Sequence, residues 1–154
     1  MTVDVEVEDP AWTEALPDAQ AVVARAALAA LSSTGASGDE EVTVLLADDE
    51  TVRGLNARFR GKDSATNVLS FPAPAFARPH LGDLALACGV CKAEASAQGK
   101  SLADHLSHLT VHGVLHLLGW DHEADAQAEA MEAMERRILH QLGVRDPYAH
   151  GADG

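Results

Sequence analysis

The segment from His112 to His122 constrains the fold more than any other part of the sequence, because its three histidines can meet only if a helix ends and the chain turns back. His112 and His116 are four residues apart in an apolar stretch, so both imidazoles leave the same helix face one turn apart. Gly119 is a natural end for that helix, since glycine readily adopts the left-handed conformation that closes helices. The chain can then bring His122 back toward the same face.

This spacing predicts a three-histidine metal site. Neutral imidazoles suit Zn²⁺ or a similar borderline metal, and three of them leave one coordination position open for a water molecule. The pattern therefore indicates hydrolysis. A lone histidine on an apolar helix face is most often a core residue, but this combination of three histidines and a glycine is hard to obtain by chance. The other histidines are interpreted as polar surface groups or as hydrogen-bonding partners of the ligands: His80, His105, His108, His140 and His150.

The spacing H-x-x-x-H-x-x-G-x-x-H is also that of the metzincin peptidases, but one residue differs. Those enzymes carry a glutamate after the first histidine, where it acts as general base toward the metal-bound water. This chain has Gly113 there, which can neither accept nor deliver a proton. Glu123 follows the third histidine, but we do not expect it to project from the metal-binding face. The ligand set of a metallohydrolase is therefore retained without the chemistry of a peptidase.

Three segments together resemble the YbeY family. His112–His122 is similar to the family signature H-G-x-L-H-L-x-G-[WY]-D-H. Leu55–Pro72 is similar to the block N-x-x-[YF]-R-x-x-D-x-x-T-[DN]-V-L-S-F-P, and Leu81–Leu86 resembles the family's L-G-D-I strand. The segments occur in the family order, and the resemblance covers the chain from about Glu41 to Leu142.

The resemblance implies an activity, a cofactor and partners. Members of the family are bacterial single-strand-specific metallo-endoribonucleases of rRNA maturation and ribosome quality control, which here implies a role at the 3′ end of 16S rRNA. The metal would be held by His112, His116 and His122, and it would activate the attacking water. We expect one Zn²⁺ per chain, or another divalent transition metal. The expected partners are single-stranded RNA, chiefly rRNA, and the ribosome or its associated factors, with neither DNA nor a membrane among them.

The resemblance also implies roles for residues near the predicted metal. Arg60 matches an arginine regarded as functionally important in the family, and a guanidinium binds phosphoryl oxygens in a bidentate manner. Lys62 is a candidate for a second phosphate contact. Asp83 and Asp121 are candidates to orient the ligand histidines, with hydrogen bonds at a strand end and in a turn as an equal alternative.

Two other functions stay open at this point. The first is a metal-dependent hydrolase of a non-RNA substrate such as a peptide, which Gly113 disfavours. The second is a ribosome-associated factor in which the metal is structural. A fourth protein ligand, or a site closed to solvent, would favour that second function.

Charge limits how such a chain could bind nucleic acid. The formal net charge is −13, which argues against binding over the whole surface. Four of the eleven basic residues nevertheless fall within ten positions: Arg53, Arg58, Arg60 and Lys62. Such a focused patch could hold a few phosphates, although a solvated helix face is the alternative interpretation.

Length and composition predict one compact enzyme domain over residues 1–154. The chain is near the commonest domain size, and 47% of its residues are hydrophobic. Its acidic N-terminus is unlike a signal peptide, and no apolar run approaches the ~20 residues of a membrane span, so we expect a cytoplasmic protein. Cys88 and Cys91 form a lone C-x-x-C, which we interpret as two reduced side chains at a strand–helix junction, with a redox pair as the alternative.

Periodicity predicts an α/β (α+β) fold with a small mixed sheet of about four strands covered by helices. The histidine pair would lie on a central helix, and the order of the strands cannot be read from the sequence. A proline-rich connection should join the third and fourth strands without a tight hairpin. The expected strands are Val3–Glu8, Val42–Ala47, Asn67–Phe71 and Leu81–Ala87. The expected helices are Trp12–Ser32, Asp49–Phe59, Val90–Gln98, Ser101–Leu118 and Ala124–Leu142.

Overall fold

The chain folds around one four-stranded sheet, and the computed structural model describes residues 1–34, 37–121 and 123–148. In chain order the elements are β1 (Thr2–Val7), α1 (Ala11–Ala15), α2 (Ala19–Ser33), β2 (Glu41–Ala47), α3 (Asp49–Arg60), β3 (Val68–Pro72), the 3-10 helix η1 (Ala75–Ala77), β4 (His80–Ala87), α4 (Cys88–Ala97), α5 (Leu102–Leu117) and α6 (Asp125–Gln141).

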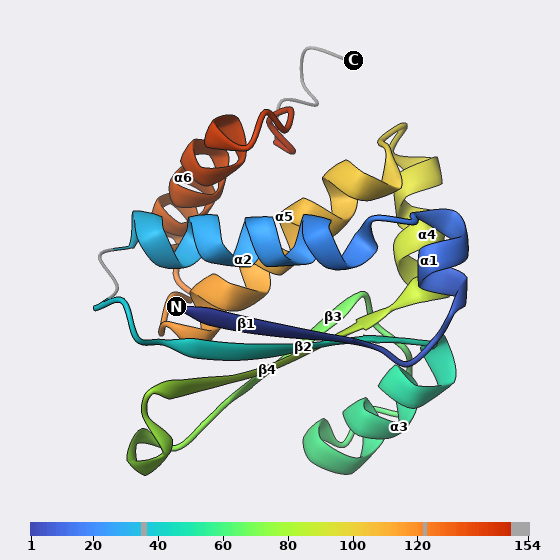
Figure 1. Ribbon diagram of the computed structural model, residues 1–154, viewed down its shortest axis with the longest axis horizontal. Helices are drawn as coiled ribbons and strands as arrows, with labels where there is room; N and C mark the ends of the chain where they lie inside the picture. Colours follow the sequence, from blue (N-terminus) through green and yellow to red (C-terminus); the bar gives the residue numbers. More distant parts are fainter. Residues whose placement is uncertain (35–36, 122, 149–154) are drawn as a thin grey trace.

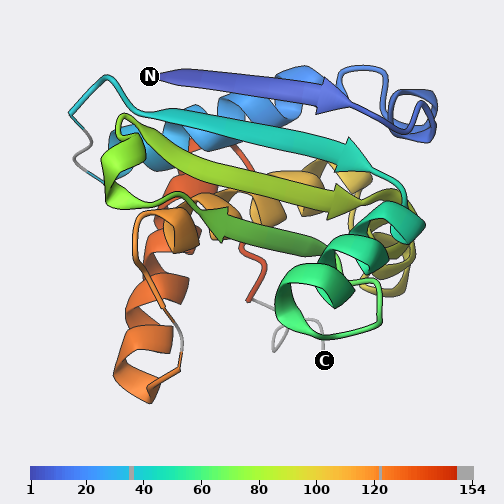
Figure 2. The ribbon, with the colours of Figure 1, turned by 90° about the horizontal axis from the view of Figure 1, so that it is seen from below.

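The sheet is mixed, as the sequence predicts. Its strands lie in the order β1-β2-β4-β3, and β1, β2 and β4 are parallel (Figures 1 and 2). β3 lies at one edge and runs antiparallel to β4, with Leu69 opposite Ala85. The edge strand matters for the site, because the side chains and backbone of β3 border the cleft described below.

Helices cover both faces of the sheet. α2 and α5 pack against one face, and α3 lies on the other (Figure 1). The central strand β4 shows the consequence: Leu84 and Leu86 belong to the larger hydrophobic core under α2 and α5, whereas Ala85 and Ala87 belong to a smaller one toward α3. A strand covered on both faces carries a nearly continuous apolar run, and β4 has one.

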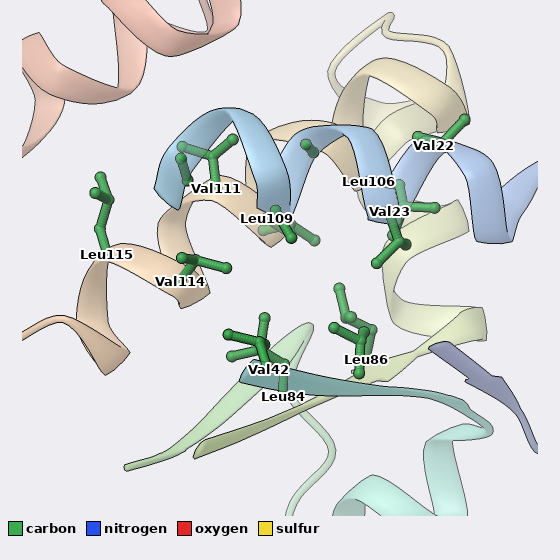
Figure 3. Close-up of a cluster of buried hydrophobic side chains, with 14 of the residues drawn as sticks. Val22, Val23, Val42, Leu84, Leu86, Leu106, Leu109, Val111, Val114 and Leu115 are labelled. Carbon is green, nitrogen blue, oxygen red and sulfur yellow. The ribbon is translucent and has the colours of Figure 1, made fainter. Parts of the chain in front are cut away.

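α5 is the central helix that the sequence predicts. It contacts α2, α4, α6, β3 and β4. Figure 3 shows its apolar side chains packed against α2 and the sheet; those labelled on α5 are Leu106, Leu109, Val111, Val114 and Leu115. Gly113 allows the closest approach, because a Cβ atom there would lie only 2.8 Å from Leu84 Cδ2. The missing side chain at position 113 is therefore a packing requirement as well as the absence of a base.

Most predicted elements match the observed ones to within about two residues. The exception is the helix predicted over Trp12–Ser32, which is wrong because α1 and α2 are separate helices divided at residues 16–18. Pro17 causes the break, since proline disfavours helical geometry in the residue before it. Leu16 is accordingly extended, with φ −144° and ψ 88°.

Two local features follow from the sequence. Asp48 caps α3, where its carboxylate accepts a hydrogen bond of 2.7 Å from the backbone N–H of Thr51. The connection between β3 and β4 spans residues 73–79 and contains η1, so it is no tight hairpin.

Cys88 and Cys91 lie in the first turn of α4, directly after β4, and both thiols are free and buried. Burial raises the pKa of each thiol above its ordinary value. A redox-active cysteine needs an accessible thiolate, so this environment agrees with two reduced structural side chains.

Each helix in the described part of the chain is too short or too polar to cross a membrane.

Candidate metal centre

Two of the three predicted ligands lie side by side on α5. His112 and His116 present their Nε2 atoms to each other at 3.1 Å, with ring centroids 4.6 Å apart. The helix ends at Leu117, and Gly119 follows with a positive φ of 98°. The i, i+4 pair and the glycine stop are therefore present as the sequence predicts.

The partners of the two Nδ1 atoms fix which ring nitrogens carry protons. His116 Nδ1 lies 3.0 Å from the carbonyl oxygen of Trp120, which can only accept, so this Nδ1 donates. His112 Nδ1 lies 2.8 Å from Glu135 Oε2 and donates to that carboxylate. In the neutral rings both Nε2 atoms then carry lone pairs that face each other, an arrangement that favours a cation against both. The donor set therefore fits a borderline divalent metal.

Glu135 of α6 is the hub of the hydrogen bonding behind His112. Its side chain is 1% exposed, and it accepts hydrogen bonds from His112 Nδ1 (2.8 Å), His108 Nε2 (2.8 Å) and the Tyr148 hydroxyl (2.6 Å). Burial opposes ionisation of Glu135, but the hydrogen bonds from His108, His112 and Tyr148 outweigh it and lower the pKa of this carboxyl to about 2. The ionised carboxylate holds the His112 ring with its Nε2 atom toward the cleft.

The sequence prediction missed Glu135, although a signal for it exists. Glu135 is four residues after Met131 and three before Ile138, and both of these are buried. A charged residue on the apolar face of an amphipathic helix is rarely buried without a partner. That placement could have indicated a carboxylate directed at the histidines of α5.

Two histidines outside the predicted ligand set also have carboxylate partners. His108 lies next to Glu135 and within 3.3 Å of the Tyr148 hydroxyl, so its interpretation as a hydrogen-bonding group near the ligands is supported. His105 is only 3% exposed, and its Nε2 pairs with Glu94 at 2.9 Å. The alternative interpretation of His105 as a surface group is therefore wrong, because α5 turns this side chain toward α4.

The histidine pair borders a cleft of about 910 Å³. One wall comes from α5, with His108, His112 and His116. The other, here called the α3–β3 wall, comes from the end of α3 with Arg60, from the following loop with Lys62, and from β3. The cleft thus brings four of the predicted site residues together. Its remaining lining residues include Asn56, Ser64, Thr66, Asn67, Ser70, Trp120 and Tyr148.

Arg60 is anchored at the edge of the sheet. Its Nη2 donates a hydrogen bond of 2.6 Å to the backbone carbonyl of Ser70, and its guanidinium carbon lies 5.9 Å from the centre of the Phe71 ring. The hydroxyl of Ser70 points the other way, toward the carbonyl oxygen of Gly113 at 3.4 Å. β3 therefore links the Arg60 wall to the histidine helix.

The other predicted site residues differ in their placement. The interpretation of Asp83 as an orienting group is wrong. Asp83 alternates with Leu84 along β4, so its side chain points away from α5, and its carboxylate lies 3.4 Å from His80 instead. Asp121 lines the cleft, and so does Glu123, which was not expected to face the metal-binding side. His122 lies outside the described residues. Within residues 1–34, 37–121 and 123–148, no group of three or more His, Cys, Asp or Glu side chains is arranged to hold a metal ion, so the third ligand stays a prediction.

Fold and site together define a class of protein: a small α/β domain in which one central helix presents a histidine pair to a cleft beside a mixed sheet, opposite an arginine. Within that class, the chain belongs to the YbeY family. The family model described as Endoribonuclease YbeY matches residues 6–143.

Similar proteins agree with this assignment. The protein named Endoribonuclease YbeY from Paramagnetospirillum magneticum is 52% identical, over 95% of this chain and 94% of the relative. The protein of the same name from Azorhizobium caulinodans is 51% identical over the full length of both chains. Among solved structures, the solution structure of TM1509 from Thermotoga maritima matches with a TM-score of 0.56 and 20% identity, over 95% of this chain and 98% of that one. At this identity the last comparison supports the fold alone.

Proposed function

We propose that this protein is a metal-dependent endoribonuclease that cuts single-stranded RNA, with the 3′ end of 16S rRNA as its substrate and ribosome quality control as its setting. The names of its relatives support the activity. One observation carries the proposal: two imidazoles with inward lone pairs share a cleft with Arg60 and Lys62. Such a cleft can hold a metal and a phosphate side by side.

His112, His116 and His122 would hold the metal, which we propose to be one Zn²⁺. A bound zinc would supply Lewis acidity to a phosphoryl oxygen and to the attacking water. The protein's own contribution is orientation. Glu135 and the carbonyl oxygen of Trp120 accept from the Nδ1–H groups, so in the neutral rings both Nε2 atoms carry the lone pair and are directed into the cleft.

Arg60 would bind the scissile phosphate. Its Nη2 already donates to the carbonyl oxygen of Ser70, which fixes the direction of the guanidinium, and its remaining N–H groups can donate to phosphoryl oxygens. Lys62, farther along the same wall, would hold a neighbouring phosphate. This assignment gives the charge that develops on the phosphate a fixed positive partner.

The acidic surface would restrict the substrate to unpaired RNA. A flexible strand can enter the cleft and meet the basic wall, whereas a duplex would bring many phosphates against a protein of net charge −13. The peptidase alternative is less well supported, because Gly113 packs on Leu84 and leaves no room for a base there. The two free buried thiols agree with a reducing, cytoplasmic setting.

The test is cleavage of labelled RNA by the zinc-loaded protein, with single-stranded and duplex substrates side by side. We expect cleavage of the single strand only, its loss in His116→Ala together with bound zinc, and no loss in the control His140→Ala, which alters an exposed histidine of α6. In binding measurements across a salt series, the slope of log K against log salt should correspond to only two to four phosphates contacted, with about 0.7 counterion released at each. Cleavage of casein in place of RNA, or full activity of His116→Ala, would contradict the proposal.

A further inference from the structure

All three phenylalanines of the chain lie outside its fully buried core. Phe59 is 59% exposed and Phe76 is 90% exposed, while Phe71 is partly buried against the smaller core. A single exposed apolar side chain is ordinary, but a contiguous exposed aromatic surface marks a binding site. Phe59 is exposed but not isolated, because it contacts a second ring and a cation.

Four side chains at the end of α3 and on β3 form a continuous row, here called the aromatic row: Arg58, Phe59, Phe71 and Arg60. The guanidinium carbon of Arg58 lies 5.3 Å from the centre of the Phe59 ring. The Phe59 and Phe71 rings meet edge to face with centroids 5.7 Å apart, and the Arg60 guanidinium carbon lies 5.9 Å from the Phe71 centroid. Cation and ring thus alternate along the surface.

The aromatic row is continuous with the cleft, and its two arginines have no carboxylate partner among the described residues. Arg60 belongs to both, since it lines the cleft and also lies over Phe71. Arg53 of the same helix is neutralised by Glu50 (3.0 Å) and Asp63 (2.9 Å). By contrast, no ion pair among the described residues involves Arg58 or Arg60.

We propose that the aromatic row binds the single-stranded RNA next to the scissile phosphate, with a base stacked on Phe59 and the backbone held by Arg58 and Arg60. The inference rests on the proposed function, because it assumes that the strand in the cleft is RNA. Exposed aromatic rings with arginines beside them bind single strands through base stacking, which tolerates any sequence. A strand leaving the cleft past Arg60 meets Phe71 and then Phe59.

The test compares two RNA lengths on the full chain, kept uncleaved by a chelator. A dinucleotide fills only the cleft, whereas an oligonucleotide of about 12 residues is within the site sizes of single-strand binders and reaches the aromatic row. For Phe59→Ala, we expect affinity for the longer RNA to fall at least about fivefold, with the dinucleotide unaffected. Phe59→Trp should restore binding, and Phe59→Leu, which stays apolar without a ring face, should not.

Phe76→Ala is the matched control. Phe76 is even more exposed, but it lies in η1, at the end of the sheet away from α3 (Figures 1 and 2). The Phe76→Ala variant should bind both RNAs like the wild type. Equal binding of the longer RNA by Phe59→Ala and the wild type overturns the proposal, and so does an equal loss in Phe76→Ala. A change of oligomeric state in Phe59→Ala without a change in RNA binding also overturns it, since the row would then be a protein interface.

The same proteins separate this inference from the proposed function. A wild type that binds the longer RNA through Phe59, yet cleaves no RNA when loaded with zinc, supports the aromatic row and contradicts the proposed reaction. A wild type that cleaves RNA but binds it equally well without Phe59 contradicts the row alone.

Discussion

The two walls of the cleft are built in opposite ways. On the α5 wall, the half-buried His108 and His112 are both hydrogen-bonded to the buried Glu135 of α6. On the α3–β3 wall, the basic side chains Arg60 and Lys62 are exposed, and Arg60 is held by one backbone carbonyl. The first wall is held by hydrogen bonds between side chains, whereas the second exposes its basic side chains to solvent.

The difference suits the two tasks that we propose. A metal needs nitrogens placed within a few tenths of an ångström, and buried hydrogen bonds to an ionised carboxylate give that precision. An RNA strand needs cations that its phosphates can reach, and exposed arginine and lysine side chains supply them at a cost in salt sensitivity. Substitutions on the α5 wall should therefore alter stability and metal affinity, and substitutions on the α3–β3 wall should alter RNA cleavage alone.

The largest effect is expected from Glu135→Ala. Three partly buried donors lose their buried acceptor, so the free energy of unfolding should fall by about 3 kcal/mol. Zinc affinity should fall about 10- to 100-fold, because His112 loses the group that orients it. Urea denaturation and chelator competition measure the two quantities.

Glu132→Ala is the control for Glu135→Ala. It removes a carboxylate of the same helix that lies 3.8 Å from Arg136, with both side chains more than 40% exposed. An exposed pair of this kind contributes about 0–1 kcal/mol, and zinc binding should not change. If Glu135→Ala bound zinc as tightly as Glu132→Ala, the α5 wall would not be organised by Glu135.

The next effect compares one glycine near each wall. Gly113→Ala would place a Cβ atom 2.8 Å from Leu84 Cδ2, and overpacking of this kind should destabilise the protein by about 1–3 kcal/mol. Gly54→Ala lies in α3, where a Cβ atom meets nothing within 4 Å, and it should stabilise by up to about 1 kcal/mol. Opposite signs in thermal or urea unfolding are expected. A stabilised Gly113→Ala would mean that α5 is not packed tightly on β4.

How much of this the sequence could predict depends on how far apart the partners are in the chain. The histidine pair and Gly119 lie within one helix and its end, so spacing alone predicts them. Glu135 reaches His112 across 23 residues, through the packing of α6 on α5. Tyr148 lies 13 residues beyond Glu135. The helical pattern of α6 could indicate that Glu135 is buried with a partner, but the local pattern around Tyr148 does not indicate that this residue joins them.

The errors have the same origin. For Asp83 the motif left two interpretations equally open, orientation of a ligand and hydrogen bonding at the strand end. The alternation of the strand decides against the first, because Leu84 takes the face toward α5. Strand order is likewise set by packing between distant segments. The break at Pro17 is different, since the rule for residues before proline could have predicted two helices.

Arg60→Ala tests the α3–β3 wall. RNA cleavage should fall at least about tenfold, a loss of roughly 1.4 kcal/mol in transition-state stabilisation, because the phosphate loses its cation. Zinc content and melting temperature should stay those of the wild type, since Arg60 is exposed. Arg53→Ala is the control: Arg53 belongs to the same basic cluster but is already paired with Glu50 and Asp63. Equal losses in the two variants would reduce Arg60 to a contributor of net charge.

The smallest effect concerns His105, in the first turn of α5 outside the cleft, and depends on pH. Burial lowers the pKa of His105 below its ordinary value of 6.5, and the positive charges of Lys100 and His108 lower it further. The hydrogen bond to Glu94 acts in the opposite direction but does not cancel the shift. The unfolded chain therefore binds the proton more readily than the folded one. Stability from this group is full above about pH 6.5 and is lost as the pH falls from there toward the depressed pKa, by less than about 1.4 kcal/mol per pH unit.

His105→Gln keeps a donor for Glu94 but does not titrate, so its unfolding free energy should fall less than that of the wild type between about pH 7 and pH 5. Because all other groups are common to both proteins, the difference between the two urea-denaturation curves isolates His105. Glu135 does not interfere, since its lowered pKa acts only below about pH 4.5. Parallel curves over this range would show that the first turn of α5 tolerates a charged imidazole at His105. The contrast between the two walls of the cleft would then be confined to the residues around Glu135.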